Sequence, residues 1–189
     1  MQIPSQLMTL PNQLTLSRIV AVPVICLFVA SGWEWLRWIA LLLYIAAAIT
    51  DWLDGFLARR MKLNSALGKM LDPIADKLLV GGLLVTLAWT RDLGALDLIP
   101  AIAILMREMF IAGLREYLGK QAIEVPVSVL AKWKTTAQLV ALGLLIAAPM
   151  LVGLIGIAHF VLWIAAAMTI WTGWEYLRAT WPYLAGNEL

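Results

Sequence analysis

Long apolar blocks and short polar stretches alternate along this chain, and the pattern predicts six membrane-spanning helices. A helix crosses the hydrocarbon core of a bilayer with about 20 mostly apolar residues, which is close to the length of each block. The mixed segment before the first block is expected to form a short interfacial helix on the membrane. The expected spans are 13–30, 34–60, 73–90, 96–119, 133–152 and 154–178, within one domain of residues 1–189. The expected fold class is therefore all-α, in a polytopic membrane protein.

Composition supports this interpretation, because 62% of the residues are hydrophobic. The formal net charge of +2 is too small to indicate nucleic acid as a partner, so we expect none. A single cysteine, Cys26, excludes an intramolecular disulfide. Composition alone thus indicates the lipid bilayer as a partner, without indicating a reaction.

Four aspartates interrupt the apolar pattern between residues 51 and 76. Asp51 and Asp54 are three residues apart, and Asp72 and Asp76 are four apart, so each pair lies on one face of a helix. Carboxylates at membrane depth are costly and usually mark function. Because four facing carboxylates would repel one another, divalent cations are their expected partners, and hard oxygen ligands favour Mg²⁺ or Mn²⁺.

Two other interpretations of the aspartates stay open at this stage. Asp72 precedes Pro73, so it is a good candidate for a helix N-cap with proline at the first helical position. Acids within a membrane also serve as proton or cation pathways. A transport pathway does not explain the accompanying glycines or Arg59.

The residues between the aspartates complete a longer pattern, D-x2-D-G-x2-A-R-x8-G-x3-D-x3-D. This pattern resembles the signature of the CDP-alcohol phosphotransferases, integral membrane enzymes of phospholipid synthesis. The resemblance implies that two metal ions bind the four aspartates and that Asp76 occupies the position of the general base. The implied metal ligands are Asp51, Asp54, Asp72 and Asp76.

Several further positions are candidates for binding a CDP-linked lipid. Gly55 and Ala58 share a helical face with the first acid pair, where small side chains let a ligand approach the backbone. A polar stripe, N-x2-T-x2-R, enters the first span, although its Arg18 could instead snorkel to the membrane surface. The resemblance favours a place beside the nucleotide for this stripe. With Arg59, Ser65 and Gly68, which the resemblance implies, the CDP-lipid candidates are Asn12, Thr15, Gly55, Ala58, Arg59, Ser65 and Gly68.

Cations in the second half of the chain indicate a phosphorylated acceptor. Arg107 and Arg115 are eight residues apart on broadly one face of the fourth span. A salt bridge with Glu108 or snorkelling would explain them without a ligand, although Arg107 lies too deep to snorkel cheaply. The candidates for acceptor-phosphate binding are Arg107, Arg115, Lys132 and Lys134.

Three motifs narrow the resemblance to the bacterial phosphatidylglycerophosphate synthases: N-x-L-T-x2-R, R-E-x6-R-E and K-x-K-T-T-A-Q. It implies transfer of a phosphatidyl group from CDP-diacylglycerol to glycerol 3-phosphate, with release of CMP. Phosphatidylinositol-phosphate and cardiolipin-type synthases, which use other acceptors, remain alternatives, as do a cation transporter and a structural membrane protein. The resemblance also implies a homodimer.

Charge predicts the orientation in a bacterial cytoplasmic membrane. Of the fourteen basic residues, only Arg37 and Arg91 flank the turns on one side. The positive-inside rule therefore places both termini and the four aspartates on the cytoplasmic side, where nucleotide substrates are found.

Overall fold

The computed structural model describes the backbone of residues 10–61, 66–121, 123, 125–126 and 128–185. It describes their side chains except those of residues 10, 11, 51–61, 66, 67, 69 and 129. Over this part of the chain the secondary structure is helical, with no strand, which confirms the all-α prediction. The helices are α1 Leu10–Ala30, α2 Glu34–Met61, α3 Ala66–Trp89, α4 Leu98–Lys120, α5 Val129–Ala147, the short 3₁₀ helix η2 Ala148–Met150, and α6 Leu154–Leu184.

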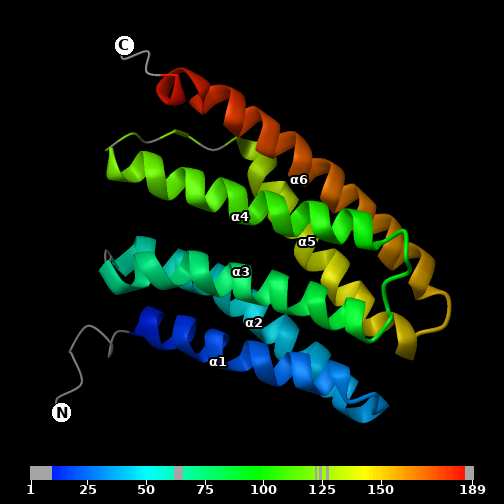
Figure 1. The fold of residues 1–189 in the computed structure, drawn as a ribbon. Helices are drawn as coiled ribbons and strands as arrows, with labels where there is room; N and C mark the ends of the chain where they lie inside the picture. Colours follow the sequence, from blue (N-terminus) through cyan, green and yellow to red (C-terminus); the bar gives the residue numbers. More distant parts are fainter. Residues whose placement is uncertain (1–9, 62–65, 122, 124, 127, 186–189) are drawn as a thin grey trace.

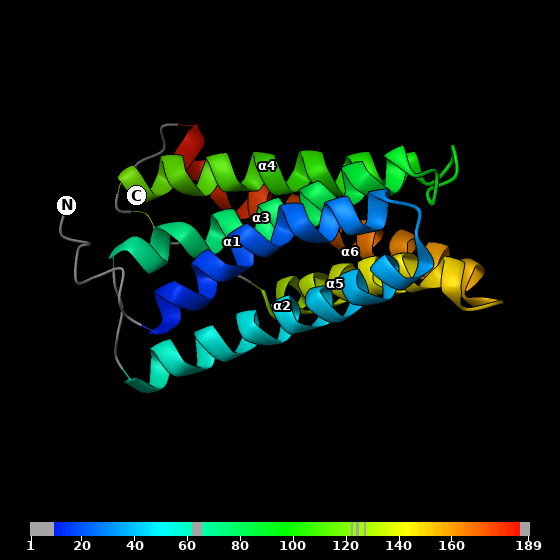
Figure 2. The same ribbon diagram turned by 90° about the horizontal axis from the view of Figure 1, so that it is seen from below.

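The six α-helices of the described residues run back and forth in one bundle (Figures 1 and 2). Helices α1 and α3 begin, and α2, α4 and α6 end, at the end of the bundle that carries Asp72 and Asp76, which we call the aspartate end, while α5 begins nearer the middle of the bundle and runs toward the opposite end. The connections 31–33, 90–97 and 151–153 lie at the opposite end, the far end. The start of α1 and the end of α6 therefore share the aspartate end.

Helix packing divides the bundle into two groups, which are joined by contacts of α5 and of α3. Helix α1 packs against both α2 and α3, and α6 packs against both α4 and α5. Helix α5 also contacts α2 and α3, and α3 contacts α4. The polar stripe of α1 thus lies on the helix that packs against both aspartate-bearing helices.

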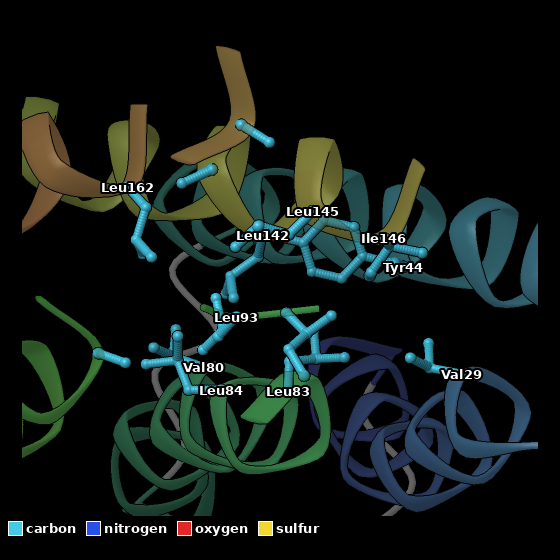
Figure 3. Close-up of a cluster of buried hydrophobic side chains, with 14 of the residues drawn as sticks. Val29, Tyr44, Val80, Leu83, Leu84, Leu93, Leu142, Leu145, Ile146 and Leu162 are labelled. Carbon is cyan, nitrogen blue, oxygen red and sulfur yellow. The ribbon is translucent and has the colours of Figure 1, made fainter. Parts of the chain in front are cut away.

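The apolar core lies where α5 meets α2 and α3 (Figure 3). Leu83 of α3 and Leu145 of α5 are fully buried there. The ring of Tyr44 lies in the same cluster, and its hydroxyl donates a hydrogen bond to the carbonyl oxygen of Leu139 at 2.7 Å. A buried hydroxyl needs such a partner, and here the bond ties α2 to α5.

Helix α3 begins well before the expected span at Pro73. It starts at Ala66 and continues through Pro73, so Asp72 lies inside the helix. The helix-cap interpretation of Asp72 is therefore wrong, because a cap residue lies outside the helical turns. Its carboxylate is instead presented on the side of a helix, one turn before Asp76.

By length and composition, two of the described helices can cross a membrane: Asn12–Ala30 and Leu154–Leu184, with mean hydropathies of 1.9 and 2.0. Helices α2, α3, α4 and α5 have 28, 24, 23 and 19 residues. At 1.5 Å per residue these lengths also match a hydrocarbon core of about 30 Å. Large apolar side chains such as Leu42, Val85 and Phe110 are exposed on α2, α3 and α4. Spanning by these four helices remains a prediction.

Polar side chains join the connections at the far end, and we name five of them the far-end clasp: Arg37, Asp92, Asp97, His159 and Trp163. Arg37 Nη2 lies 2.7 Å from Asp92 Oδ2. His159 Nδ1 lies 3.2 Å from Asp97 Oδ2, and the indole Nε1 of Trp163 donates to Asp97 Oδ1 at 3.1 Å.

Backbone groups complete the far-end clasp. Arg37 Nε donates to the carbonyl oxygen of Ile146 at 2.8 Å, and His159 Nε2 lies 3.1 Å from the carbonyl oxygen of Asp92. Helices α2, α5 and α6 and the connection 90–97 are therefore held together by charge-assisted hydrogen bonds.

Candidate active site

The second acid pair of the signature faces the polar stripe of α1. Thr15 Oγ1 donates a hydrogen bond to Asp72 Oδ1 at 2.8 Å. Arg18 Nη1 lies 3.0 Å from Asp76 Oδ1, in an ion pair. Thr15 and Arg18 are one turn apart on α1, and the two aspartates are one turn apart on α3, so the two stripes match along the packed helices.

The ion pair is asymmetric in its exposure. The Arg18 side chain is 1% exposed, whereas the Asp76 side chain is 50% exposed. The snorkelling alternative for Arg18 is therefore wrong, because the guanidinium lies within the protein. Asn12, one turn earlier on the stripe, is also buried. A buried cation thus supports a carboxylate that is half exposed.

The first acid pair lies on α2, where the structure describes only the backbone. Asp51 and Asp54 belong to the continuous helix Glu34–Met61, as do Gly55, Ala58 and Arg59. Their side chains lie outside the described residues, and Ser65 lies outside altogether. Gly68 lies in the first turn of α3. The predicted sharing of one helical face by Asp51 and Asp54 agrees with the helical backbone.

Among the described side chains, no three histidine, cysteine, aspartate or glutamate residues gather as a metal site. The described half of the predicted set, Asp72 and Asp76, still has suitable chemistry for a metal. Both residues are exposed, and they offer carboxylate oxygens from one face of one helix. Such hard ligands fit Mg²⁺ or Mn²⁺.

A pocket of about 600 Å³ opens between the end of α4, the segment before α5, and the last turns of α6. It lies toward the aspartate end, since α4 and α6 both end there (Figure 1). Three arginines and one glutamate give its lining an excess of two positive charges. The lining residues are Arg107, Arg115, Pro126, Ser128, Ala131, Thr172, Glu175, Tyr176, Arg178 and Ala179.

Two of the four predicted acceptor residues line this pocket. Arg107 donates from Nη2 to Thr172 Oγ1 at 3.2 Å and from Nη1 to Glu108 Oε1 at 3.2 Å. The guanidinium carbon of Arg115 lies 5.1 Å from the centre of the Tyr176 ring, in a cation–π contact. The partners on α6 hold both guanidinium groups at the pocket wall.

The two predicted lysines differ in their surroundings. Lys134 is buried, and its Nζ binds Glu108 Oε1, so it joins the cluster behind the pocket wall. Lys132 is exposed and does not belong to the pocket lining. The structure therefore brings Arg107, Arg115 and Lys134 together, and leaves Lys132 outside.

Sequence reasoning missed the contribution of α6. Thr172, Tyr176 and Arg178 of the lining come from a helix that was interpreted as a simple span. A signal was present, because Thr169, Thr172, Tyr176 and Thr180 recur every three or four residues and all four are buried. A buried polar stripe on an apolar helix indicates an interior polar site.

Comparison with known proteins agrees with the signature. A family model described as CDP-alcohol phosphatidyltransferase matches residues 8–171. A relative from Rickettsia bellii (strain RML369-C) is 44% identical over 177 residues, 92% of this chain and 96% of its own length. It is named CDP-diacylglycerol–glycerol-3-phosphate 3-phosphatidyltransferase.

Two further relatives are similar over nearly the whole chain. One from Cereibacter sphaeroides carries the same name and is 39% identical over 218 residues, 95% of this chain and 99% of its own. One from Oryza sativa subsp. japonica, named cardiolipin synthase (CMP-forming), is 38% identical over 198 residues, 96% of this chain and 60% of its own. The resemblance inferred from the aspartate signature is confirmed: the chain belongs to the CDP-alcohol phosphatidyltransferase family and is a transferase of phosphorus-containing groups.

Proposed function

We propose that this protein transfers a phosphatidyl group from CDP-diacylglycerol to glycerol 3-phosphate, which yields phosphatidylglycerophosphate and CMP. The names of the relatives from Rickettsia bellii and Cereibacter sphaeroides specify this donor and this acceptor. Both relatives align with more than nine-tenths of the chain.

The observation that carries the proposal is the charge of the pocket. Its three arginines exceed its single glutamate by two positive charges. A phosphate monoester carries roughly two negative charges at neutral pH, and arginine is suited to bind it with two parallel hydrogen bonds. Serine, which has no net charge, and choline, which is a cation, would leave the excess positive charge of the pocket unmatched.

In the proposed reaction, a hydroxyl oxygen of glycerol 3-phosphate attacks the phosphorus of the phosphatidyl group. A new P–O bond forms, the P–O bond to CMP breaks, and CMP leaves with the electron pair. Asp76 accepts the hydroxyl proton, since its side chain is half exposed and carboxylates act as general bases. Buried Arg18, ion-paired with Asp76, fixes the orientation of this carboxylate.

The remaining predicted residues bind the donor. Two divalent cations, held by Asp51, Asp54, Asp72 and Asp76, would supply charge neutralisation at the phosphates. Thr15 orients Asp72 through its hydrogen bond. We propose the following residues as the CDP-lipid contacts: Asn12, Thr15, Gly55, Ala58, Arg59, Ser65 and Gly68.

A cardiolipin-type reaction is the second candidate, because the relative from Oryza sativa subsp. japonica is named cardiolipin synthase (CMP-forming). Its acceptor, phosphatidylglycerol, is a phosphodiester with one negative charge and two acyl chains. The excess of two positive charges in the pocket favours the phosphomonoester.

We further propose that all six α-helices cross a bacterial cytoplasmic membrane with the aspartate end in the cytoplasm. The far-end connections contain Arg91 and lie next to Arg37, whereas other basic residues of the described helices, such as Arg59, Arg115 and Arg178, lie near the aspartate end. A homodimer is proposed from the family resemblance, and chemical crosslinking in native membranes tests it.

The test is CMP release by the detergent-purified protein from CDP-diacylglycerol with Mg²⁺ or Mn²⁺. Glycerol 3-phosphate, inositol phosphate, serine and phosphatidylglycerol are offered separately. Asp76→Asn and EDTA are the controls, and both should abolish release if the carboxylate and the cations act as proposed.

The four acceptors separate the candidate functions. Release with glycerol 3-phosphate alone supports the proposed reaction. Release with phosphatidylglycerol alone establishes the cardiolipin-type reaction instead. Release with Asp76→Asn at the wild-type rate would refute the role of Asp76, whichever acceptor is used.

A further inference from the structure

Arg107 reaches the pocket by crossing helix α6 at a glycine. At Gly173, which is buried, an added Cβ atom would lie 2.9 Å from Arg107 Cγ and 3.0 Å from Arg107 Nε. Atoms at such distances overlap, so no larger residue fits at position 173 while Arg107 keeps this path. The missing side chain at Gly173 therefore forms the passage for Arg107.

The end of the Arg107 side chain is held from two directions. Its Nη2 donates to Thr172 on α6 and its Nη1 to Glu108 on its own helix, both at 3.2 Å. Its Nε is buried and has no hydrogen-bond partner among the described residues. An unsatisfied buried donor costs stability, so this conformation is one that the surroundings impose.

Glu108 is the centre of these surroundings. Its Oε1 accepts hydrogen bonds from Arg107, from Lys134 and, at 3.3 Å, from Gln138. Gln138 Nε2 also donates to Thr169 Oγ1 at 2.8 Å, which extends the network to α6. Glu108 itself does not belong to the pocket lining. It contacts Arg107 of the pocket wall without facing the pocket.

We propose that Glu108 is a positioning residue for acceptor binding, and that with the passage at Gly173 it aims the Arg107 guanidinium at the acceptor phosphate. The proposal rests on the proposed function and explains why an acid lies beside a site for an anion. It also gives Lys134 an indirect role, because its ammonium group is ion-paired with Glu108 and so helps to hold Glu108 in place.

The direction in which Glu108→Gln changes acceptor binding distinguishes a positioning role of Glu108 from a purely electrostatic one. If Glu108 acted only through its charge, Glu108→Gln would strengthen acceptor binding, because a negative charge near an anion opposes binding. If Glu108 positions Arg107, the same change weakens binding. Gly173→Ala displaces Arg107 without changing any charge, and so it tests the same geometry by a second route.

The experiment measures KM for glycerol 3-phosphate and for CDP-diacylglycerol in both variants. We expect the glycerol 3-phosphate KM to rise about tenfold in each, as for the loss of one charge-assisted contact. The CDP-diacylglycerol KM should stay within about twofold. Glu108→Asp, which keeps the charge but shortens the arm, should lie between the wild type and Glu108→Gln.

Matched controls come from the same helices. Glu116 on α4 is paired with Lys120 and its side chain is 73% exposed, so Glu116→Gln removes an acid outside the network. A Cβ atom added at Gly156 on α6 would meet nothing within 4 Å, so Gly156→Ala adds a methyl group where space is open. Both controls should keep both KM values.

A binding measurement separates this proposal from the proposed reaction. Inorganic phosphate is added to detergent-purified protein, and the shift of the unfolding temperature is recorded. The proposal is supported if phosphate raises the unfolding temperature of the wild type and if Glu108→Gln and Gly173→Ala need about tenfold more phosphate for the same rise. Equal shifts in all three proteins overturn the proposal. Unchanged or lowered KM values for the acceptor in the two variants also overturn it, even if glycerol 3-phosphate proves to be the acceptor.

The two proposals can fail separately. If glycerol 3-phosphate gives no CMP release, the proposed reaction fails, and the phosphate-dependent shift of the unfolding temperature still tests whether Glu108 positions Arg107.

Discussion

Two of the polar clusters in the described part of this bundle differ in how completely their hydrogen-bonding groups are satisfied. In the far-end clasp, Arg37 binds Asp92 and a backbone carbonyl, and Asp97 accepts a hydrogen bond from Trp163 and lies 3.2 Å from His159 Nδ1. The pocket cluster, comprising Arg107, Glu108, Lys134, Gln138 and Thr172, has more cations than anions, and a donor of Arg107 has no partner among the described residues.

The difference indicates what each cluster is for. A cluster whose donors and acceptors satisfy one another has nothing left for a ligand, so its contribution is to hold helices together. A cluster with excess charge at the wall of a pocket stays incomplete until an anion arrives. Substitutions in the far-end clasp should therefore change stability, whereas substitutions in the pocket cluster should change acceptor binding.

The largest effect on stability is expected from Arg37→Leu. The Asp92 side chain is only 11% exposed, and it would lose the cation that lies 2.7 Å away. Leaving a buried charge without its partner costs about 3–5 kcal/mol. Thermal unfolding in detergent, followed by tryptophan fluorescence, should show a strongly lowered Tm, while the KM for glycerol 3-phosphate of the folded protein is unchanged.

The control for Arg37→Leu is Arg91→Gln, which removes an exposed positive charge from the same end. This control should shift the free energy of unfolding by less than about 0.5 kcal/mol, as is usual for surface positions. An acceptor KM that rises in Arg37→Leu at low temperature would contradict the separation of the two clusters.

The next largest effect is expected from Arg107→Ala. It removes a charged group that lines the pocket, and hydrogen bonds to charged groups contribute about 1.5–3 kcal/mol. The value of kcat/KM for glycerol 3-phosphate should fall about 10- to 100-fold, with little change in the KM for CDP-diacylglycerol. Arg107→Lys should recover only part of this loss, because the two Nη atoms of Arg107 bind two different partners.

Lys120→Ala is the matched control for Arg107, since Lys120 lies on the same helix with its side chain 74% exposed. It should leave both KM values in place. Equal losses for donor and acceptor in Arg107→Ala would refute a specific role of Arg107 at the acceptor.

A smaller effect is expected from His159→Leu, which weakens the far-end clasp at its more exposed side. The His159 side chain is 28% exposed, so water can replace part of its contact with Asp97. We expect a loss of about 1 kcal/mol in the free energy of unfolding, the usual net value of one hydrogen bond. Thermal unfolding measures this loss, and a drop as large as that of Arg37→Leu would show that His159 matters as much as the buried arginine.

The sequence predicts local features of the site better than its long-range contacts. The shared face of Asp72 and Asp76 follows from their spacing within one helix, as does that of Arg107 and Arg115. The contact between Thr15 and Asp72 joins residues 57 positions apart, and the contact between Arg107 and Thr172 joins residues 65 apart. Such contacts depend on which helices pack together, and the periodicity of one helix does not contain that information.

Gly173 and His159 are two further residues whose roles cannot be predicted from the sequence alone. A glycine in an apolar helix is ordinary in sequence, and only the path of Arg107 across it shows what its missing side chain permits. A lone histidine in apolar sequence shows no partner by its position, yet His159 contacts the connection 90–97 through both ring nitrogens. In both residues the role is determined by a partner on another element.

The smallest effect is expected from Lys132→Ala, and it tests the boundary of the pocket cluster. Sequence reasoning grouped Lys132 with Lys134, but Lys132 is exposed and outside the lining, whereas Lys134 is buried against Glu108. The KM for glycerol 3-phosphate should therefore change less than about twofold in Lys132→Ala, as for other surface positions. Lys134→Ala should raise it clearly more, because Glu108 would lose the cation that shares its carboxylate with Arg107.

Measured side by side, the two variants remove the same charge two residues apart, so a difference in acceptor KM between them can only come from the position of the lysine. If Lys132→Ala instead raises the acceptor KM as much as Lys134→Ala, the acceptor is attracted by the general positive charge at this end of the bundle, and the comparison between the far-end clasp and the pocket cluster loses its basis.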